Sequence, residues 1–244
     1  MRTYAIGDIH GHLDLLQQVH AWIAADIAQH GPAPVVHIGD LVDRGANSRG
    51  VIDYLSQGIA AGQDWVVLKG NHDRMFSLFL TDPAAQDPRL RSDLSYLHPR
   101  IGGGATLASY GVQNASDRPI APVHRDAIAA VPQAHRDFLH ALPTSFQRGE
   151  VLFCHAGIRP GVAFADQTED DLTWIRHDFL DDTRDHGALI VHGHTAIDAP
   201  THYGNRLNID SSAAYGGPLS VVVLEGRQVF HLKDGQRHPL LPQA

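Results

Sequence analysis

Residues 35–45 read VVHIGDLVDRG, in which a short run of β-branched and aliphatic side chains passes directly into glycine and two aspartates. A run of this kind predicts a buried strand, and the polar cluster after it predicts a functional loop. The same arrangement opens the chain, where residues 3–6 precede the cluster GDIHG at 7–11. Two strands that both end in acidic loops indicate an α/β fold with a site at one edge of its sheet.

Helical patterns connect these runs. Apolar residues spaced by three and four positions over 15–27 predict an amphipathic helix that ends at Gly31-Pro32. A second helix is predicted over 51–59, after the capping residues Asn47 and Ser48. Because another strand-like run follows at 65–68, the front third is predicted to be β-α-β-α-β. Two further runs of this kind lie at 151–154 and 189–191.

Residues 74–150 have a different character, because short helical stretches are broken by prolines and by three glycines at 102–104. We expect them to form a helical cap inserted over the site. After residue 194 strand-like runs return at 206–209, 219–224 and 228–232, and we expect hairpins that form a second sheet. One domain over residues 1–244 is predicted, with a solvated tail over 233–244.

Composition narrows the classes of partner. With 19 basic and 27 acidic residues the formal charge is −8, which argues against a nucleic-acid partner held by a broad basic surface. No apolar run is long enough to span a membrane, and no signal peptide is recognisable at the N-terminus. The single cysteine, Cys154, excludes an internal disulfide. We therefore expect a cytoplasmic monomer without a membrane partner.

Each of the five strand-like runs at the front and centre of the chain ends in a polar cluster. Because ligands bind at the carboxyl ends of strands in open α/β sheets, these clusters are expected to converge. They offer carboxylates, imidazoles and an amide oxygen, the ligand types of a two-metal site. A carboxylate such as Asp40 can bridge cations about 3.5–4 Å apart. The clusters are GDIHG (7–11), GDLVDRG (39–45), GNHD (70–73), HAG (155–157) and HGHT (192–195).

In wording and order these clusters resemble those of the calcineurin-like metallophosphoesterases, and among them the phosphoprotein phosphatases of bacterial and bacteriophage lambda type. The family motifs read GD-x-HG, GD-x-x-DRG, GNH-[DE], HAG or HGG, and GHT. The resemblance covers most of the chain and implies a four-layer α/β/β/α sandwich of two mixed β-sheets flanked by helices. Residues 102–106, 174–176 and 209–211 also look similar. One departure is Ile101, where bacterial relatives usually have asparagine.

The resemblance implies a dinuclear centre of two divalent cations. Mn²⁺ is expected, with Fe, Zn, Mg, Ni or Co as alternatives. His192, which is not the family ligand, is expected to be a packed residue, and so are His37 and Cys154. Carried over to this sequence, the first metal would be held by Asp8 and His10, the second by Asn71, His155 and His194, with Asp40 bridging them.

The resemblance also implies a reaction in which a hydroxide shared by the two cations attacks phosphorus directly. Arg44 and Arg176, with Asn71, would bind the phosphate oxygens through charge-assisted hydrogen bonds. The leaving group would receive its proton from His72, which Asp43 would orient.

Three functions follow from the resemblance. The first is a phosphatase acting on phosphoserine or phosphothreonine in proteins, with phosphotyrosine as a further possible substrate. The second is a symmetrical diadenosine tetraphosphate hydrolase, although those enzymes usually have alanine where this chain has Asp43. The third is a non-catalytic binding scaffold, which the presence of all six expected ligands argues against. The substrate is expected to be a phosphorylated protein or a small phosphoester.

Overall fold

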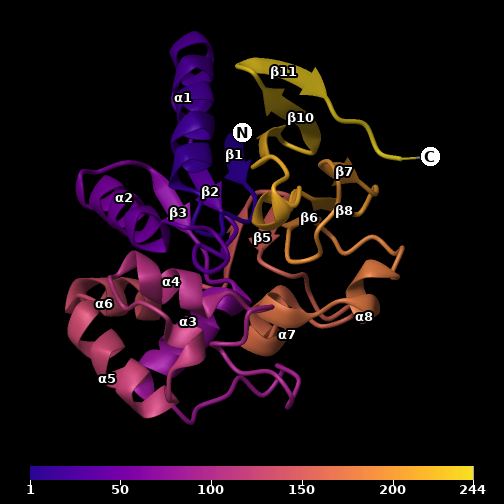
Figure 1. Cartoon of the computed structure of the whole chain (residues 1–244). Coiled ribbons are helices and arrows are strands. Elements are labelled where there is room, and N and C mark those ends of the chain that lie inside the picture. The colour runs from indigo at the N-terminus through magenta and orange to yellow at the C-terminus, as the bar shows by residue number, and fades with distance from the viewer. Residues whose placement is uncertain (244) are drawn as a thin grey trace.

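The computed structural model describes residues 1–243, and its strands form two sheets (Figure 1). The first sheet has the order β11-β10-β9-β1-β2-β3 and the second the order β4-β5-β6-β8-β7. The strands of the first are β1 (Arg2–Ile6), β2 (Val35–His37), β3 (Trp65–Val67), β9 (Val221–Glu225), β10 (Gln228–Lys233) and β11 (Gln236–Pro239). Those of the second are β4 (Ser145–Arg148), β5 (Val151–Cys154), β6 (Leu189–His192), β7 (Thr201–His202) and β8 (Arg206–Asn208).

Both sheets are mixed. In the first, β1, β2 and β3 run parallel while β9, β10 and β11 are antiparallel to their neighbours. In the second, β5, β6 and β8 run parallel and are flanked by antiparallel β4 and β7. Five of these parallel strands, β1, β2, β3, β5 and β6, are those predicted to end in polar clusters, whereas β8, expected in a hairpin, pairs parallel with β6.

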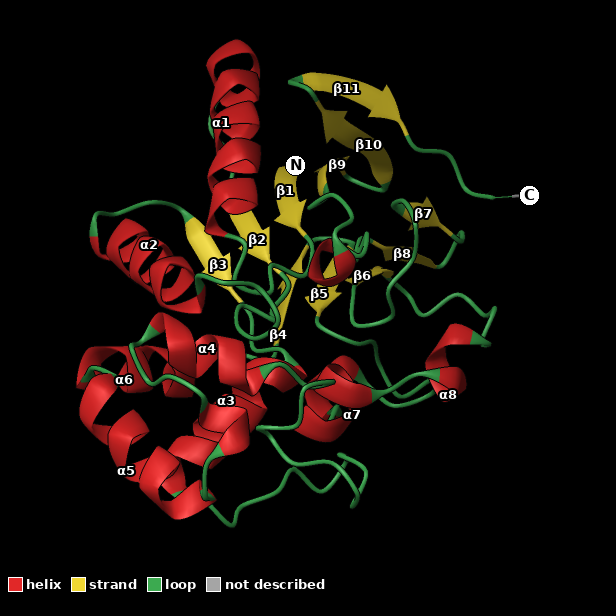
Figure 2. Cartoon of the chain, viewed as in Figure 1, coloured by secondary structure: helices red, strands yellow, loops and turns green. Residues whose placement is uncertain are grey.

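The helices lie on the outer faces of the two sheets and in a separate group. Helices α3 to α6 lie together below the strands in the view of Figure 2. None of the helices in the described part of the chain combines the length and apolar character needed to cross a bilayer. The helices are α1 (Leu13–His30), α2 (Ser48–Ala60), α3 (Asn71–Thr81), α4 (Gly103–Ser109), α5 (Ile120–Ala130), α6 (Gln133–Ala141), α7 (Glu169–Trp174) and α8 (His177–Leu180), with 3₁₀ turns η1 (Ala115–Asp117), η2 (Phe164–Asp166) and η3 (Ala213–Tyr215).

The alternation of side chains along each strand creates the layers. Tyr4 and Ile6 of β1 pack with α1, α2 and α3 in one core, whereas Ala5 points to a second core between the sheets. In the same way Phe153 of β5 faces the other sheet, while Cys154 packs against α7 and α8. The expected four-layer arrangement, with two mixed sheets flanked by helices, is confirmed.

Two expectations for the C-terminal third are wrong. Strands β9 and β10 do not extend a second sheet, because they pair with β1 in the first. The tail predicted over 233–244 contains β11, which pairs with β10. At the other boundary, β4 lies inside the expected cap segment 74–150 but belongs to the second sheet.

Strand β11 is tied to α1 by Arg237. Its guanidinium donates to both carboxylate oxygens of the buried Asp26, the Nε bond being 2.7 Å long, and Tyr4 donates to the same carboxylate. Burial favours the neutral acid, but the bonds from Arg237 and Tyr4 hold the pKa of Asp26 below its usual range. The ionised carboxylate of Asp26 therefore stabilises the folded protein at pH values above the usual pKa of aspartate.

We expect Arg237→Met to lower the free energy of unfolding by about 3 kcal/mol at pH 7, because it leaves a buried carboxylate without its cation. The difference from the native protein should shrink as the pH falls through the depressed pKa of Asp26. Urea unfolding at pH 7 and pH 3 measures both effects. The exposed Lys233→Met on the same hairpin is the matched control, and an equal loss in that variant would contradict the assignment.

Candidate metal centre

The six predicted ligands come together at the carboxyl ends of the parallel strands. The segments after β1, β2 and β3 supply four of them, and the loops after β5 and β6 supply the other two. All six side chains are buried. They are Asp8, His10, Asp40, Asn71, His155 and His194.

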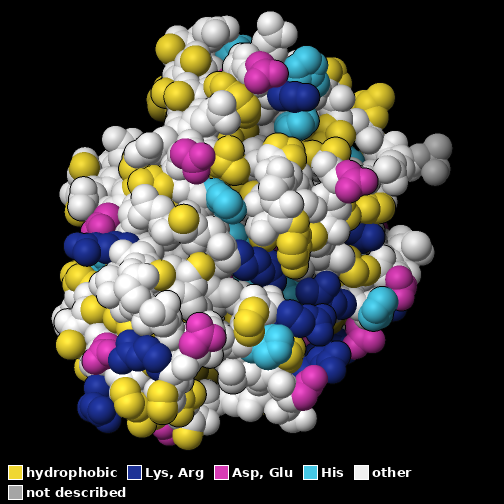
Figure 3. Space-filling model, in the orientation of Figure 1, with side chains coloured by type: hydrophobic (Ala, Val, Ile, Leu, Met, Phe, Trp, Pro, Cys, Tyr) yellow, Lys and Arg dark blue, Asp and Glu magenta, His cyan; other side chains and the backbone are white. Residues whose placement is uncertain are grey.

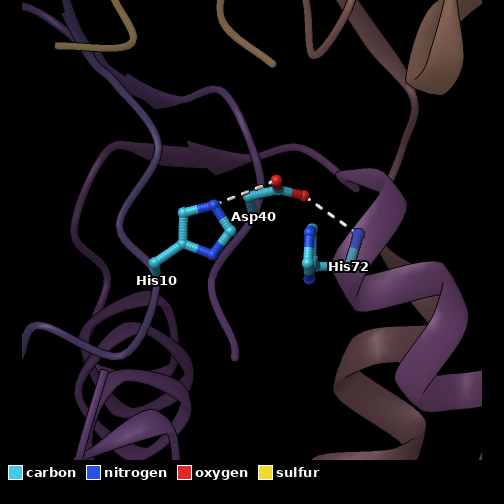
Figure 4. A group of neighbouring side chains, drawn as sticks. All are labelled: His10, Asp40 and His72. Carbon is cyan, nitrogen blue, oxygen red and sulfur yellow. Dashed lines mark hydrogen bonds and ion pairs between the residues drawn. The ribbon is translucent and has the colours of Figure 1, made fainter. Parts of the chain in front are cut away.

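Asp40 lies at the centre of this group. One of its carboxylate oxygens is 3.3 Å from His10 Nε2, and the other is 3.3 Å from His155 Nε2. Figure 4 shows the carboxylate between His10 and the main chain of His72, whose N–H donates to it at 3.0 Å. Although burial alone would raise the pKa of Asp40, the neighbouring His155 and His72 hold it well below the usual range. The position suits a carboxylate shared by two cations.

Asn71 links the remaining imidazoles. Its side-chain oxygen is 2.9 Å from His155 Nε2 and 2.9 Å from His194 Nδ1. Potential ligand atoms of Asp40, His155 and His194 all lie within 4.8 Å of one another, as do those of His10, Asp40 and His72. Two groups of donors that share Asp40 therefore lie side by side.

Two buried atoms of this group have no protein partner. Among the described residues Asp8 Oδ1 and His194 Nε2 make no hydrogen bond. Burial, together with Asp210 and Asp40, raises the pKa of Asp8 well above its usual value, although the main-chain N–H of His194 donates to its other oxygen at 3.0 Å. Divalent cations would supply partners for both atoms, and the donor set fits them.

Two glycines let the carboxylates sit against bare backbone. A Cβ atom on Gly70 would lie 2.2 Å from Asp40 Oδ1, and one on Gly193 would lie 1.9 Å from Asp8 Oδ1. Any larger residue at either position would displace the acid. Gly70 and Gly193 therefore allow the loops that carry these residues to approach one another closely.

The backbone of the site is strained. Eight non-glycine residues in the described part of the chain have positive φ, and five of these belong to the predicted site. Such conformations cost about 1–3 kcal/mol each and persist only where the surrounding packing enforces them. The strain indicates that the fold fixes the site geometry. The five are His10, Asp40, Asp43, Arg44 and His194.

His72 and Asp43 form a buried pair. His72 Nδ1 is 2.7 Å from Asp43 Oδ2, and the other oxygen of Asp43 accepts hydrogen bonds from Tyr96 at 2.9 Å and Thr106 at 2.7 Å. The carboxylate is therefore fixed on three sides, and it sets the orientation of the imidazole. The other nitrogen of His72 faces the cavity described next, where Arg44 lies 3.1 Å from it.

A cavity of about 650 Å³ lies over these residues and is lined by Arg44 and Arg176. Arg44 Nη1 also lies 3.0 Å from His10 Nε2, so a cation on that nitrogen has to replace this hydrogen bond. Arg176 donates to the main-chain oxygen of His194 at 3.1 Å and to Thr195 Oγ1 at 3.3 Å. Both guanidinium groups stand where they can contact a phosphate above the ligands.

The residues expected to be packed are packed. His192 is fully buried and lies 3.3 Å from Arg206 Nη1, and the buried His37 contacts His20 at 2.9 Å. Cys154 is fully buried, and burial raises the pKa of its thiol to about 12. These three residues lie outside the cavity lining.

Sequence reasoning missed several cavity residues. Asp210 is buried beside Asp8, and burial raises its pKa. Its only signal in the sequence is the family resemblance of residues 209–211. Asp73 accepts from the main-chain N–H groups of Leu41 at 2.9 Å and Gly70 at 2.8 Å, and so holds two ligand loops together. Three arginines of the loop between α3 and α4 and an exposed tyrosine carried no recognisable signal. These four are Arg89, Arg91, Arg100 and Tyr215.

The chain is similar to several known proteins. The asymmetrical bis(5'-nucleosyl)-tetraphosphatase PrpE of Bacillus mycoides is 24% identical over 241 residues, which cover 90% of this chain and 89% of that protein. The enzyme of the same name from Anoxybacillus flavithermus is 26% identical, covering 89% and 88%. Among solved structures, a cold-active protein tyrosine phosphatase shares the fold, with a TM-score of 0.66 at 20% identity over 99% of this chain and 79% of that one.

Residues 1–224 match the sequence profile of the family described as calcineurin-like phosphoesterases. This match spans both sheets up to β9 and includes every residue of the candidate centre. Enzymes of this family hydrolyse phosphoesters with a pair of divalent cations, and the clustered acids and imidazoles described above are candidate ligands for such a pair. The chain therefore belongs to the calcineurin-like phosphoesterases and is a metal-dependent hydrolase.

Proposed function

We propose that this protein hydrolyses dinucleoside polyphosphates, with dinucleoside tetraphosphates as its main substrates. The observation that carries the proposal is the ring of five arginines around a cavity of about 650 Å³, a volume in the range of nucleotide-sized ligands. The protein as a whole has a formal charge of −8, so this concentration of positive charge is local. The ring consists of Arg44, Arg89, Arg91, Arg100 and Arg176.

The outer arginines favour a substrate with several phosphates. Within residues 1–243 the guanidinium groups of Arg89 and Arg100 make no hydrogen bond or ion pair, and both side chains are exposed. A phosphomonoester engages the inner Arg44 and Arg176 alone, whereas a tetraphosphate chain carries a charge on each phosphate and reaches further. Figure 3 shows basic side chains gathered near the middle of the face in view. The names of the PrpE relatives agree with this assignment.

In the reaction, the oxygen of water bonds to phosphorus and the bond to a bridging oxygen breaks, which releases two nucleotides. Two divalent cations, proposed to be Mn²⁺, would lower the pKa of the water and neutralise phosphate charge. Arg44, Arg176 and the amide of Asn71 would hold the non-bridging oxygens. His72, oriented by Asp43, would stand ready to protonate the leaving oxygen.

The His72–Asp43 pair supports a second candidate, a phosphatase for phosphoserine and phosphothreonine proteins. An alkoxide leaving group needs a proton donor, and the 2.7 Å contact of Asp43 with Nδ1 leaves the other nitrogen of His72 facing the cavity. The test is a side-by-side measurement of kcat/KM for diadenosine tetraphosphate and for phosphoserine and phosphothreonine peptides with Mn²⁺. A higher value for either peptide would overturn the first proposal in favour of the second.

We further propose that the enzyme acts in the cytoplasm as a monomer.

We expect Arg100→Gln and Arg89→Gln each to lower kcat/KM for diadenosine tetraphosphate by about tenfold. A charged hydrogen bond contributes about 1.5–3 kcal/mol when buried and less at these exposed positions. Hydrolysis of p-nitrophenyl phosphate should change by less than about threefold, because one phosphate engages only the inner arginines. Arg125→Gln on the exposed side of α5 is the matched control. Equal losses on both substrates would show that the outer arginines do not bind further phosphates.

A further inference from the structure

A groove of about 430 Å³ adjoins the main cavity. Three residues line both, namely Arg44, Arg100 and Tyr215, so that the two spaces meet at these side chains. We call the smaller space the Tyr215 groove. Arg44 lines this groove and also lies 3.0 Å from the predicted ligand His10. A substrate whose phosphate contacts Arg44 can therefore reach into the groove.

The ring of Tyr215 is exposed and held in place. It is 69% exposed, and the guanidinium carbon of Arg44 lies 5.0 Å from its centroid. The ring projects from η3, which begins after Ser212 in a left-handed conformation (φ 66°). The main-chain oxygen of Ser212 accepts from Tyr215 N at 2.8 Å and from Gly217 N at 2.9 Å. A tight turn thus places an exposed aromatic ring in the lining of the groove.

The groove is also lined by backbone. Gly102 and Gly104 offer peptide surface without side chains, and a Cβ on Gly102 would lie 2.6 Å from Arg44 N. Small residues, Ala105 and Ala214, complete an apolar lining, while Ser116 adds one hydroxyl. A flat aromatic ring, an arginine and bare peptide are the groups that bind a nucleobase by stacking and by hydrogen bonds to its edge.

We propose that the Tyr215 groove binds the nucleoside that is joined to the reacting phosphate, with the base stacked on Tyr215. The inference rests on the proposed function, since it assigns one end of that substrate. The groove adjoins Arg44 directly, so a nucleoside there is one phosphate away from the inner arginines. The three other phosphates then extend toward Arg89, and water attack at the phosphate beside the groove releases a nucleoside monophosphate and a nucleoside triphosphate.

Binding of a product fragment tests the groove independently of turnover. Adenosine monophosphate and ribose 5-phosphate carry the same phosphomonoester and differ in the base. Titration calorimetry with the Mn²⁺-loaded protein is expected to show about tenfold tighter binding of adenosine monophosphate, since base stacking on an aromatic side chain changes affinity by about five- to 150-fold. The preference should disappear in Tyr215→Ala and persist in Tyr215→Phe.

The matched control is Tyr203→Ala, because Tyr203 is another exposed tyrosine stacked on an arginine, with Arg206 at 3.7 Å, and it lies outside both spaces. Persistence of the preference in Tyr215→Ala, or its absence from the native protein, would overturn the groove assignment. If the preference is present but diadenosine tetraphosphate is not hydrolysed, the groove stands and the proposed function fails. Two nucleoside diphosphates as products would refute the assigned cleavage position.

Discussion

Asp40→Asn is expected to lower kcat/KM for every phosphoester substrate by at least about 100-fold. Changes in groups that merely orient metal ligands cost about 10–100-fold, and Asp40 stands closer to the proposed cations than any such group. Its two oxygens lie 3.3 Å from His10 and from His155, so it belongs to both candidate sets of ligands. Asparagine preserves the size of the side chain but removes the charge.

Thermal unfolding separates loss of metal from loss of fold. For the native protein, Mn²⁺ at about 100 times its Kd should add about 2.7 kcal/mol of stability, because only the folded chain brings the ligands together. For a chain of this size that corresponds to a rise in Tm of about 5–10 °C, reversed by a chelator. In Asp40→Asn most of this rise should be lost.

Asp198→Asn provides the control, since Asp198 is exposed and lies outside the cavity lining. It should retain both activity and the rise in Tm. Metal content measured by mass spectrometry completes the comparison. An Asp40→Asn protein that binds two manganese ions with native affinity would refute the shared-ligand role.

The residues of the candidate centre could be predicted because their chemistry is local in the sequence. Asp8 and Asp40 each follow directly on a strand-like run, and parallel strands bring their carboxyl ends to one edge. The resemblance then distinguished His194 from His192, which the structure buries against Phe179 outside the cavity. Local motif and parallel pairing together suffice to position such ligands.

Features that depend on long-range packing could not be predicted. The apolar residues of β9 and β10 indicate strands but do not specify which sheet they join. Residues Gln236–Pro239 lack an apolar pattern, and β11 is fixed by the contact of Arg237 with Asp26, 211 positions away. Arg100 and Tyr215 line the same cavity only because two segments far apart in the sequence fold over it. Periodicity carries no information about such loops.

His72→Asn is expected to lower kcat for alkyl phosphates by about 10²–10⁴-fold, the range for loss of a general acid. An alkoxide is a poor leaving group and needs the proton, whereas p-nitrophenolate and a nucleoside triphosphate leave as stable anions. Losses on p-nitrophenyl phosphate and diadenosine tetraphosphate should therefore remain below about tenfold. The metal content should not change, since the six predicted ligands do not include His72. His177→Asn, with a side chain that is 87% exposed, is the control.

The dependence of His72 on Asp43 gives a stricter test of the same role. Asp43 contacts His72 at 2.7 Å and is held by Tyr96 and Thr106, so it acts on the substrate only through the imidazole. Asp43→Asn should reduce kcat for alkyl phosphates, but the double variant should lose no more than His72→Asn alone. Independent roles would instead give multiplied losses. Equal effects of His72→Asn on alkyl and p-nitrophenyl substrates would exclude proton donation and leave His72 as a ligand or a phosphate-binding group, as its distance from His10 and Asp40 allows.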